Sequence, residues 1–285
     1  MESITKKSNA KINIGLDVVG KLDNGYHLVK MIMQTLTLHD VLTFTKSNEN
    51  KIMIDTNCKE IPCDENNLIY KAAQMLIGDL DSGVEIYLEK NIPVAAGLAG
   101  GSGNAAATFI AINELFELGY TKEELMKMAV KIGADVPYCI MGGTALSEGI
   151  GEVLTPLKTK INPYVLIAKP NINVSTKFVY ENLDLKKVYA HPDIDKLRTA
   201  LENNDYYNMT DSMGNILENV TIARYPVIDD IKEMMIEEGA YVSLMSGSGP
   251  TVFGFFRSQE ELDKAYNIIS KDDRVYQIHK ARFEE

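Results

Sequence analysis

A glycine-rich stretch at residues 93–103, P-V-A-A-G-L-A-G-G-S-G, has the composition of an anion-binding loop. Its four glycines would let a ligand approach the backbone N–H groups closely. Small apolar residues follow and predict a helix from about 102 to 118, whose N-terminus would carry unpaired N–H groups and a partial positive charge. A tight turn is the simpler interpretation of one glycine pair, but four glycines before a helix favour phosphate binding.

This loop matches neither of the two common nucleotide-binding motifs. The Walker pattern requires a lysine after the glycines, and none follows here. The glycine order G-x-x-G-G-x-G also differs from the dinucleotide pattern G-x-G-x-x-G. Residues 83–89, just before the loop, alternate like a half-buried strand. The local order of strand, loop and helix therefore predicts a phosphate loop of another type.

Three further stretches could carry chemistry, although each also has a simpler interpretation. Lys11 lies at the start of an expected strand, where a lysine is usually solvated. Asp135 is followed two places later by Pro137, so it could be a helix N-cap rather than a catalytic carboxylate. Residues 246–251, S-G-S-G-P-T, could form a turn between strands or a second group of anion-binding N–H groups.

Composition limits the classes of ligand. The chain has 285 residues, with 29 basic and 40 acidic side chains and a net charge of −11. This balance argues against nucleic acid or an anionic membrane as the main partner, although a small anionic ligand remains possible. The three cysteines, Cys58, Cys63 and Cys139, fit neither a disulfide framework nor a zinc-site spacing, which favours reduced thiols in the cytoplasm. We expect no membrane span and no secretory leader.

The elements expected around these stretches are both helices and strands. Alternating hydrophobicity predicts strands over 12–18, 28–38, 41–44, 51–55, 83–89, 164–168, 241–245, 251–256 and 275–279. Helical spacing and capping residues predict helices over 66–80, 102–118, 121–132, 226–238 and 258–270, and Asp23, Asn24 and Gly25 predict a turn. We therefore expect an α+β protein with two closely joined halves that meet near residue 160.

In combination, the motifs resemble those of the GHMP small-molecule kinases. That family has an N-terminal strand motif with a basic residue, a central P-x-x-x-G-L-x-x-x-S loop and a C-terminal glycine-rich loop, and all three occur here in that order. The resemblance covers the whole chain. It implies a two-part fold, with an N-terminal α/β half (1–160) that carries the phosphate loop and a C-terminal α/β half (161–285).

Two more stretches, D-N-G-Y-H at 23–27 and G-G-T-A-L-S-E-G-I-G-E at 142–152, resemble one branch of this family. That branch phosphorylates a small-molecule cytidine diphosphate substrate in non-mevalonate isoprenoid precursor synthesis. The alternatives are another GHMP kinase, of the homoserine or mevalonate type, and a non-catalytic relative that only binds a ligand. A panel of phosphate acceptors would separate these alternatives, and the sequence predicts no oligomeric state.

The resemblance also implies roles for individual residues. Lys11 and Asp135 would form the catalytic pair, in which Asp135 orients or deprotonates the acceptor hydroxyl and Lys11 keeps Asp135 ionised. ATP would be the co-substrate and would bring Mg²⁺, whose protein ligands the motifs do not identify. The implied ATP-binding residues are Pro93, Val94, Ala95, Ala96, Gly97, Leu98, Ala99, Gly100, Gly101, Ser102 and Gly103.

The implied contacts to the cytidine diphosphate substrate are Asn13, Tyr26, His27, Thr176 and Tyr180. The two tyrosines would stack on the base and His27 would read its edge. Tyr180 could instead pack on the buried face of a short helix, and His27 could be an ordinary half-buried histidine.

Two positions depart from the pattern of the branch. Gly103 stands where a second serine is usual, which leaves Ser102 as the candidate hydroxyl near Mg²⁺ or a phosphate oxygen. The stretch 214–218, G-N-I-L-E, keeps only the asparagine of a usual Asn-Asp pair, and we expect Asn215 to have a structural role.

Overall fold

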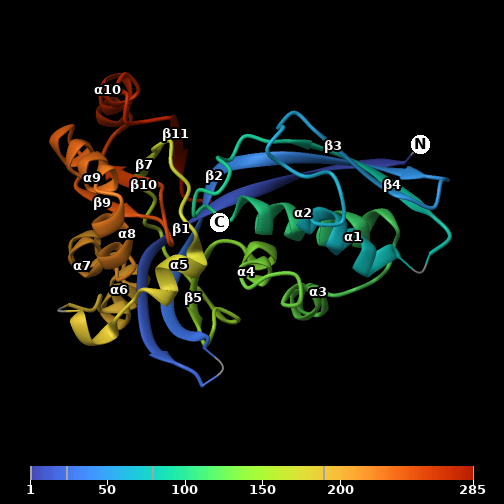
Figure 1. Ribbon diagram of the computed structural model, residues 1–285, viewed down its shortest axis with the longest axis horizontal. Helices are drawn as coiled ribbons and strands as arrows, with labels where there is room; N and C mark the ends of the chain where they lie inside the picture. The colour runs from blue at the N-terminus through green and yellow to red at the C-terminus, as the bar shows by residue number, and fades with distance from the viewer. Residues whose placement is uncertain (1, 24, 79, 189, 285) are drawn as a thin grey trace. The chain divides into compact units, whose positions relative to one another are not determined.

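The computed structural model describes residues 2–23, 25–78, 80–188 and 190–284, and Figure 1 shows its elements. The chain folds into two compact units. Unit 1 contains Met1–Ala10, His39–Val94 and Ala99–Gly142, and unit 2 contains Lys11–Leu38, Ala95–Leu98 and Gly143–Glu285. Two long strands, β1 (Ser3–Lys21) and β2 (His27–Ser47), contribute residues to both units. The sequential division into 1–160 and 161–285 stays a prediction.

In unit 1, helices pack against strands that belong to a seven-stranded sheet. The second half of β2 pairs antiparallel with β4 (Gly83–Glu89), and β3 (Ile52–Thr56) pairs parallel with β4. The helices are α1 (Leu68–Ile77), α2 (Gly100–Leu115), α3 (Lys122–Ala129) and α4 (Val136–Met141).

Helix α2 is buried on two sides because its sequence is apolar and small nearly all round. Ala107, Ala111 and Ile112 belong to the cluster formed with the strands, whereas Ala105 and Phe109 pack in the cluster formed with α3 and α4. Packing on both sides fixes the axis of α2, and with it the place at which the glycine-rich loop ends.

Unit 2 contains a four-stranded antiparallel sheet in the order β11 (Gln277–Arg282), β7 (Tyr164–Lys169), β10 (Val252–Phe256) and β9 (Val242–Met245). Buried phenylalanines of β10 pack within it, with the rings of Phe253 and Phe255 5.2 Å apart. Helix α9 (Val227–Glu237) precedes β9 in the chain, and helix α10 (Gln259–Ile269) lies between β10 and β11.

The rest of unit 2 includes the second half of β1 and the first half of β2. Strand β5 (Thr144–Glu148) pairs with β2 and with β6 (Val153–Leu157), and the two-residue β8 (Gly214–Asn215) pairs parallel with β1. Between β6 and β9 also lie α5 (Thr176–Glu181), the 3₁₀ helix η1 (Leu185–Lys187), α6 (Ile194–Glu202), α7 (Tyr206–Ser212) and α8 (Glu218–Arg224).

Most elements lie where the sequence places them, including a complete capping box at Thr121. One prediction was wrong: the two strands expected over 28–38 and 41–44 form the single strand β2. Asp40, which lies between the two predicted strands, is fully buried and its carboxylate is hydrogen-bonded, so the strand continues through it. Of the turn expected at Asp23, Asn24 and Gly25, Asn24 lies outside the described residues.

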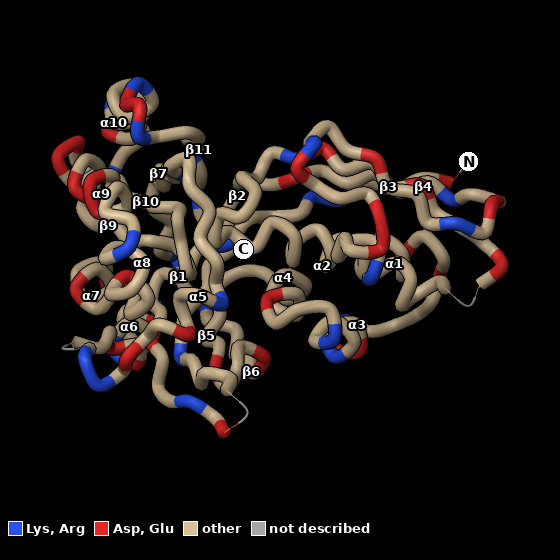
Figure 2. Tube along the Cα trace, in the orientation of Figure 1, with Lys and Arg blue, Asp and Glu red and all other residues tan. Residues whose placement is uncertain are grey.

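Acidic and basic residues are interspersed along both units, as the red and blue segments in Figure 2 show. Within the described part of the chain, no helix is long and apolar enough to cross a membrane.

Candidate active site

The glycine-rich loop has an alternating backbone conformation. Ala95, Gly97 and Ala99 have positive φ values of 49°, 71° and 55°, whereas the residues between them do not. Such alternation turns successive N–H groups toward one concave side and makes an anion-binding nest. We expected the glycines to supply the left-handed positions, but only Gly97 does so, because the other three lie inside α2. The helix also begins at Gly100, two residues before the predicted start.

Gly97 is required by a close contact within unit 2. A Cβ atom at this position would lie 2.3 Å from the backbone oxygen of Ser246, which no real contact allows. In turn, the Ser246 hydroxyl donates a hydrogen bond to the Gly97 carbonyl oxygen at 3.0 Å. The two glycine-rich loops therefore meet at Gly97 and Ser246, which connects motifs that are 149 residues apart.

The first turn of α2 is open for a ligand. Ala99, at the N-cap position, makes no side-chain capping hydrogen bond, so no side chain of its own cap satisfies the N–H groups that follow. A Cβ atom on the exposed Gly101 would have Leu68 Cδ1 as its nearest neighbour, at 3.8 Å. Among the described residues no backbone acceptor takes the N–H groups of Gly100, Gly101 or Ser102, so this turn has the donors and the bare backbone that a phosphate group needs.

A buried ion pair that our sequence analysis missed lies at the entrance to this loop. Lys90 Nζ is 2.8 Å from Asp40 Oδ2 and also donates to the carbonyl oxygen of Ile92. Asp40 Oδ1 accepts the N–H groups of Asn91 and Ile92, both at 2.7 Å. Burial lowers the pKa of Lys90, and the charge of Asp40 opposes this shift. The sequence marks this ion pair only by a lysine three residues before Pro93, and that spacing is too common to indicate a buried pair.

Lys11 is buried in β1, with 5% of its surface exposed. Its Nζ donates to Asn13 Oδ1 at 2.7 Å, and its backbone N–H donates to the Leu98 carbonyl oxygen at 3.0 Å. The interpretation of Lys11 as a solvated edge lysine is therefore wrong. Lys11, Asn13 and residues 95–98 of the first glycine-rich loop therefore lie together in unit 2.

The residues expected to contact the base also meet in unit 2. The rings of His27 and Tyr180 have centroids 5.2 Å apart and planes tilted by 40°. Tyr180 is only half-buried on α5, where Val179 takes the fully buried position, so Tyr180 is not on the buried face of its helix. Tyr26 is 61% exposed. Burial lowers the pKa of His27, and the charge of Lys21 adds to this effect.

Thr176 begins α5, and its hydroxyl forms a 2.8 Å hydrogen bond with the Ser248 hydroxyl in the second glycine-rich loop. Asn13 lies near the same loop, because a Cβ atom on Gly247 would be 3.5 Å from Asn13 Oδ1. Two of the predicted substrate contacts therefore flank the second loop.

Asp135 occupies the N-cap position of α4 but makes no side-chain capping hydrogen bond. Its φ of −83° and ψ of −12° are helical, unlike the extended backbone of a typical N-cap. A capping role therefore does not account for this aspartate. Asp135 and the half-buried Ser102 belong to unit 1, whereas Lys11 belongs to unit 2, and the pairing of Lys11 with Asp135 stays a prediction.

Asn215 has the structural role that we expected. Its side-chain amide donates to the carbonyl oxygens of Met245 and Gly247, at 2.8 and 2.7 Å. Glu218, which the sequence analysis did not single out, accepts the Met245 N–H at 2.7 Å. In the sequence, Asn215 and Glu218 are marked only by their three-residue spacing at the start of the short helix α8.

The described residues contain no group of three or more His, Cys, Asp or Glu side chains that could together hold a metal ion.

Comparisons with known proteins agree with this geometry. Residues 67–143 match the family model described as GHMP kinases N terminal domain, and residues 191–274 match GHMP kinases C terminal. The 4-diphosphocytidyl-2-C-methyl-D-erythritol kinase of Lachnospira eligens is 51% identical over 98% of both chains. The enzyme of the same name from Clostridium novyi is 50% identical, over 95% of this chain and 97% of its own.

Solved structures show the same relationship. A crystal structure of 4-(cytidine 5'-diphospho)-2C-methyl-D-erythritol kinase superposes with a TM-score of 0.84 at 26% identity, over 99% of this chain and 100% of that one. The homoserine kinase of Cytophaga hutchinsonii, at 23% identity and a TM-score of 0.80, covers 99% and 95% and shares the fold. The predicted α+β kinase fold and the predicted resemblance are thereby confirmed, and the chain belongs to the GHMP kinase family.

Proposed function

We propose that this chain transfers the γ-phosphoryl group of ATP to the 2-hydroxyl of 4-diphosphocytidyl-2-C-methyl-D-erythritol. The reaction would serve non-mevalonate isoprenoid precursor synthesis in the cytoplasm. The observation that carries the proposal is the contact between the two glycine-rich loops at Gly97 and Ser246, in the same unit as Lys11, Asn13, His27, Thr176 and Tyr180. The names and the identity of the close relatives support the choice of substrate.

Phosphoryl transfer depends mainly on positioning and on charge stabilisation. The N–H groups of the first loop and of the first turn of α2 would bind the β- and γ-phosphate oxygens. Mg²⁺ bound with ATP would supply neutralising charge, and Ser102 would place its hydroxyl near Mg²⁺ or a phosphate oxygen. Residues 93–103 would thus form the ATP-binding loop.

Asp135 would accept the proton of the acceptor hydroxyl. A carboxylate is a weak base at neutral pH, but a loose transition state requires the proton to leave only late. Lys11 would keep Asp135 ionised and polarise the hydroxyl. The 2.7 Å bond from Lys11 Nζ to Asn13 holds the lysine in place for that role.

Tyr180 and Tyr26 would stack on the cytosine ring, and His27 would hydrogen-bond its edge. A neutral imidazole has one donor and one acceptor nitrogen, and the lowered pKa of His27 keeps it neutral at pH 7. Asn13 and Thr176 would contact the methylerythritol part of the substrate.

A coupled assay of ADP release tests the proposed substrate directly. We expect turnover with the cytidine diphosphate substrate and little with homoserine or mevalonate. Turnover with homoserine or mevalonate instead would identify another GHMP kinase, and no turnover with any acceptor would favour a non-catalytic relative.

The catalytic pair is tested by Asp135→Ala, Lys11→Ala and the double variant. Each single change should lower kcat far more than it weakens ATP binding, and the double variant should lose little more, because the two residues act as a unit. Strictly additive losses would mean that the two residues act independently. An unchanged kcat in Asp135→Ala would show that Asp135 takes no part in the reaction.

The base contacts are tested by comparing cytidine and uridine versions of the substrate. Tyr180→Ala should weaken binding by about 1–3 kcal/mol, whereas Tyr180→Phe should change little, because the ring is kept. His27→Ala should shrink the preference for cytidine over uridine. In wild type, uridine would leave the hydrogen-bonding group of His27 unpaired, and the variant has no such group to leave unpaired. Because the pKa of His27 is lowered, the preference should be constant near pH 7 and fall only when acid protonates the ring.

A further inference from the structure

The second glycine-rich loop, residues 246–250, is held by hydrogen bonds to its carbonyl groups. Asn215 donates to the oxygens of Met245 and Gly247, at 2.8 and 2.7 Å. Asn215 itself is 6% exposed and fixed on β8, where its own amide oxygen accepts the Leu217 N–H at 3.0 Å. One side-chain amide therefore orients two alternate carbonyl groups of the loop.

The remaining carbonyl groups between 245 and 248 are also occupied. Gly249 N–H donates to Ser246 at 2.9 Å, and the buried hydroxyl of Thr221 on α8 lies 3.3 Å from the Ser248 oxygen. The carbonyl oxygens of residues 245–247 thus each accept a hydrogen bond from an N–H group, and the Ser248 oxygen shares the single Thr221 proton with the Leu217 oxygen.

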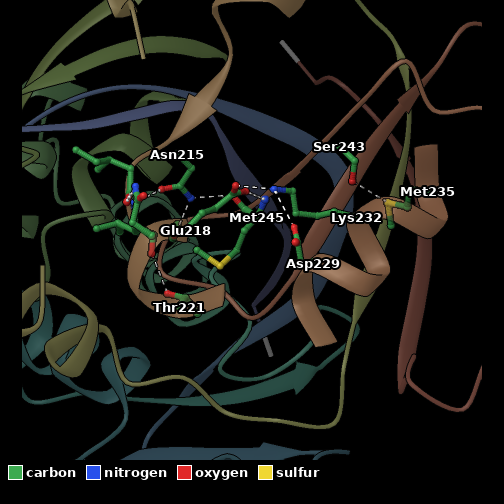
Figure 3. A network of polar contacts seen from close by, with 12 residues as sticks. Asn215, Glu218, Thr221, Asp229, Lys232, Met235, Ser243 and Met245 are labelled. Carbon is green, nitrogen blue, oxygen red and sulfur yellow. Dashed lines mark hydrogen bonds and ion pairs between the residues drawn. The ribbon is translucent and has the colours of Figure 1, made fainter. Parts of the chain in front are cut away.

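Glu218 also fixes the start of the loop, and Figure 3 shows its carboxylate bonded to Met245 and Lys232. One carboxylate oxygen accepts the Met245 N–H at 2.7 Å, and the other accepts Lys232 Nζ at 2.6 Å. The Glu218 and Lys232 side chains are 15% and 17% exposed. Because the carboxylate accepts the Met245 N–H directly, Glu218 fixes the orientation of the Met245 peptide, and Lys232 neutralises the other carboxylate oxygen without contacting the loop.

Two N–H groups of the loop are left over. Ser246 N–H donates to the Thr251 oxygen at 2.8 Å, but for Gly247 and Ser248 the described residues provide no acceptor. Gly247 has a φ of 57°, and consecutive N–H groups in such a turn form an anion-binding concavity. With its carbonyl groups tied back, the loop offers only donors on its free side.

The surroundings of these donors belong to the site described above. Ser248 bonds Thr176 through its hydroxyl, Gly247 approaches Asn13, and Ser246 holds Gly97 of the first loop. An oxygen bound by Gly247 and Ser248 would therefore lie among the proposed acceptor contacts.

We propose that Glu218 and Asn215 are positioning residues that aim the N–H groups of Gly247 and Ser248 at a phosphate oxygen of one of the two substrates. The inference rests on the proposed function. The oxygen comes from the γ-phosphate of ATP or from the diphosphate of the acceptor. In the first case the loop affects the KM for ATP, and in the second it affects the KM for the acceptor.

The test compares two variants that break the same ion pair. Glu218→Ala removes both the pair with Lys232 and the acceptor for Met245 N–H, whereas Lys232→Met removes the pair alone. Lys232 contacts Glu218 and lies 3.8 Å from Asp229, and it makes no hydrogen bond to the loop among the described residues. Both variants should lower Tm similarly, and Tm therefore serves as the control for a merely structural role.

In steady-state kinetics well below both Tm values, Glu218→Ala should lose on the order of 100-fold in kcat/KM, as expected when reacting groups are misplaced. Lys232→Met should stay close to wild type. A loss concentrated in the KM for ATP assigns the γ-phosphate as the oxygen source, and a loss in the KM for the acceptor assigns its diphosphate. Equal kinetics in Glu218→Ala and Lys232→Met would overturn the proposal.

A second variant and a binding measurement make the test independent of turnover. Asn215→Asp keeps the shape but replaces the donating amide by a carboxylate that repels two carbonyl oxygens. Calorimetric titration with a non-hydrolysable ATP analogue, and separately with the acceptor, should show weaker binding of one ligand in Asn215→Asp and Glu218→Ala but not in Lys232→Met. If wild type turns over no acceptor, the proposed function fails, and unchanged binding of both ligands in these variants would refute the positioning role separately.

Discussion

The two glycine-rich loops have similar compositions but are stabilised in different ways. The first loop depends on steric and charge constraints: Gly97 has no room for a Cβ atom, two alanines adopt positive φ, and a buried ion pair holds the entrance. The second loop depends on hydrogen bonds donated by Asn215 and Thr221 and on one accepted by Glu218, and these residues lie about 30 positions earlier in the chain. Volume and charge changes should therefore damage the first loop, and loss of single hydrogen bonds should weaken the second by smaller steps.

The largest effect that we expect is at the entrance to the first loop. Lys90→Met should lower the free energy of unfolding by about 3–5 kcal/mol, because it leaves the Asp40 carboxylate buried without its cation. The matched control in unit 1 is Lys6→Met, which breaks the pair with Glu114, whose side chain is 58% exposed, and should change stability by less than about 1 kcal/mol. Denaturant unfolding measures both, and equal effects would show that the entrance does not depend on charge.

The next effect is at the contact between the loops. Gly97→Ala should lower the free energy of unfolding by about 2–3 kcal/mol, because alanine must take a left-handed conformation and its Cβ overlaps the Ser246 oxygen. Gly101→Ala is the control for stability, since a Cβ there meets its nearest atom at 3.8 Å. If both substitutions are tolerated equally in thermal unfolding, steric constraint does not define the first loop.

A smaller loss should follow removal of one hydrogen bond from the second loop. Ser246→Ala deletes the donor to the Gly97 carbonyl oxygen at 3.0 Å and should cost about 1 kcal/mol of unfolding free energy. A double-mutant cycle with Gly97→Ala should show that the two changes are not additive, because they act on one contact. Additive effects would mean that the loops are stabilised separately.

The smallest effect should be a gain. Ala99→Gly removes an alanine from a left-handed conformation, which relieves about 1–2 kcal/mol of strain, but it also makes the unfolded chain more flexible by about 0.4–1 kcal/mol. We expect a net stabilisation of about 0.5 kcal/mol, measurable as a small rise in the denaturation midpoint. A clear loss instead would show that Ala99 makes contacts that outweigh its backbone strain.

The comparison also shows what the sequence can predict. Local patterns correctly gave strand β4 and the capping box of α3, because each depends on neighbouring residues. Anion binding by residues 93–103 stays a prediction. The positive φ values of Ala95 and Ala99 were not predictable, since alanine ordinarily avoids them and the fold imposes them here. The roles of Glu218 and Lys90 depend on partners 27 and 50 residues away, which no local pattern encodes. The roles of Lys11 and Asp135 came from the family resemblance alone.

Gly103, where the family pattern described above would place a second serine, fits closely against Ser8 and Asn9 in unit 1. A Cβ atom there would lie 2.7 Å from the hydroxyl oxygen of Ser8 and 3.1 Å from the backbone oxygen of Asn9. The Ser8 hydroxyl is buried and has no hydrogen-bond partner among the described residues. Replacing Ser8 by alanine would remove the shorter of these two contacts, while the Asn9 oxygen would stay at 3.1 Å. A serine at position 103 should therefore lower the free energy of unfolding less in a Ser8→Ala chain than beside Ser8, so the order of the two substitutions decides how unstable the intermediate is.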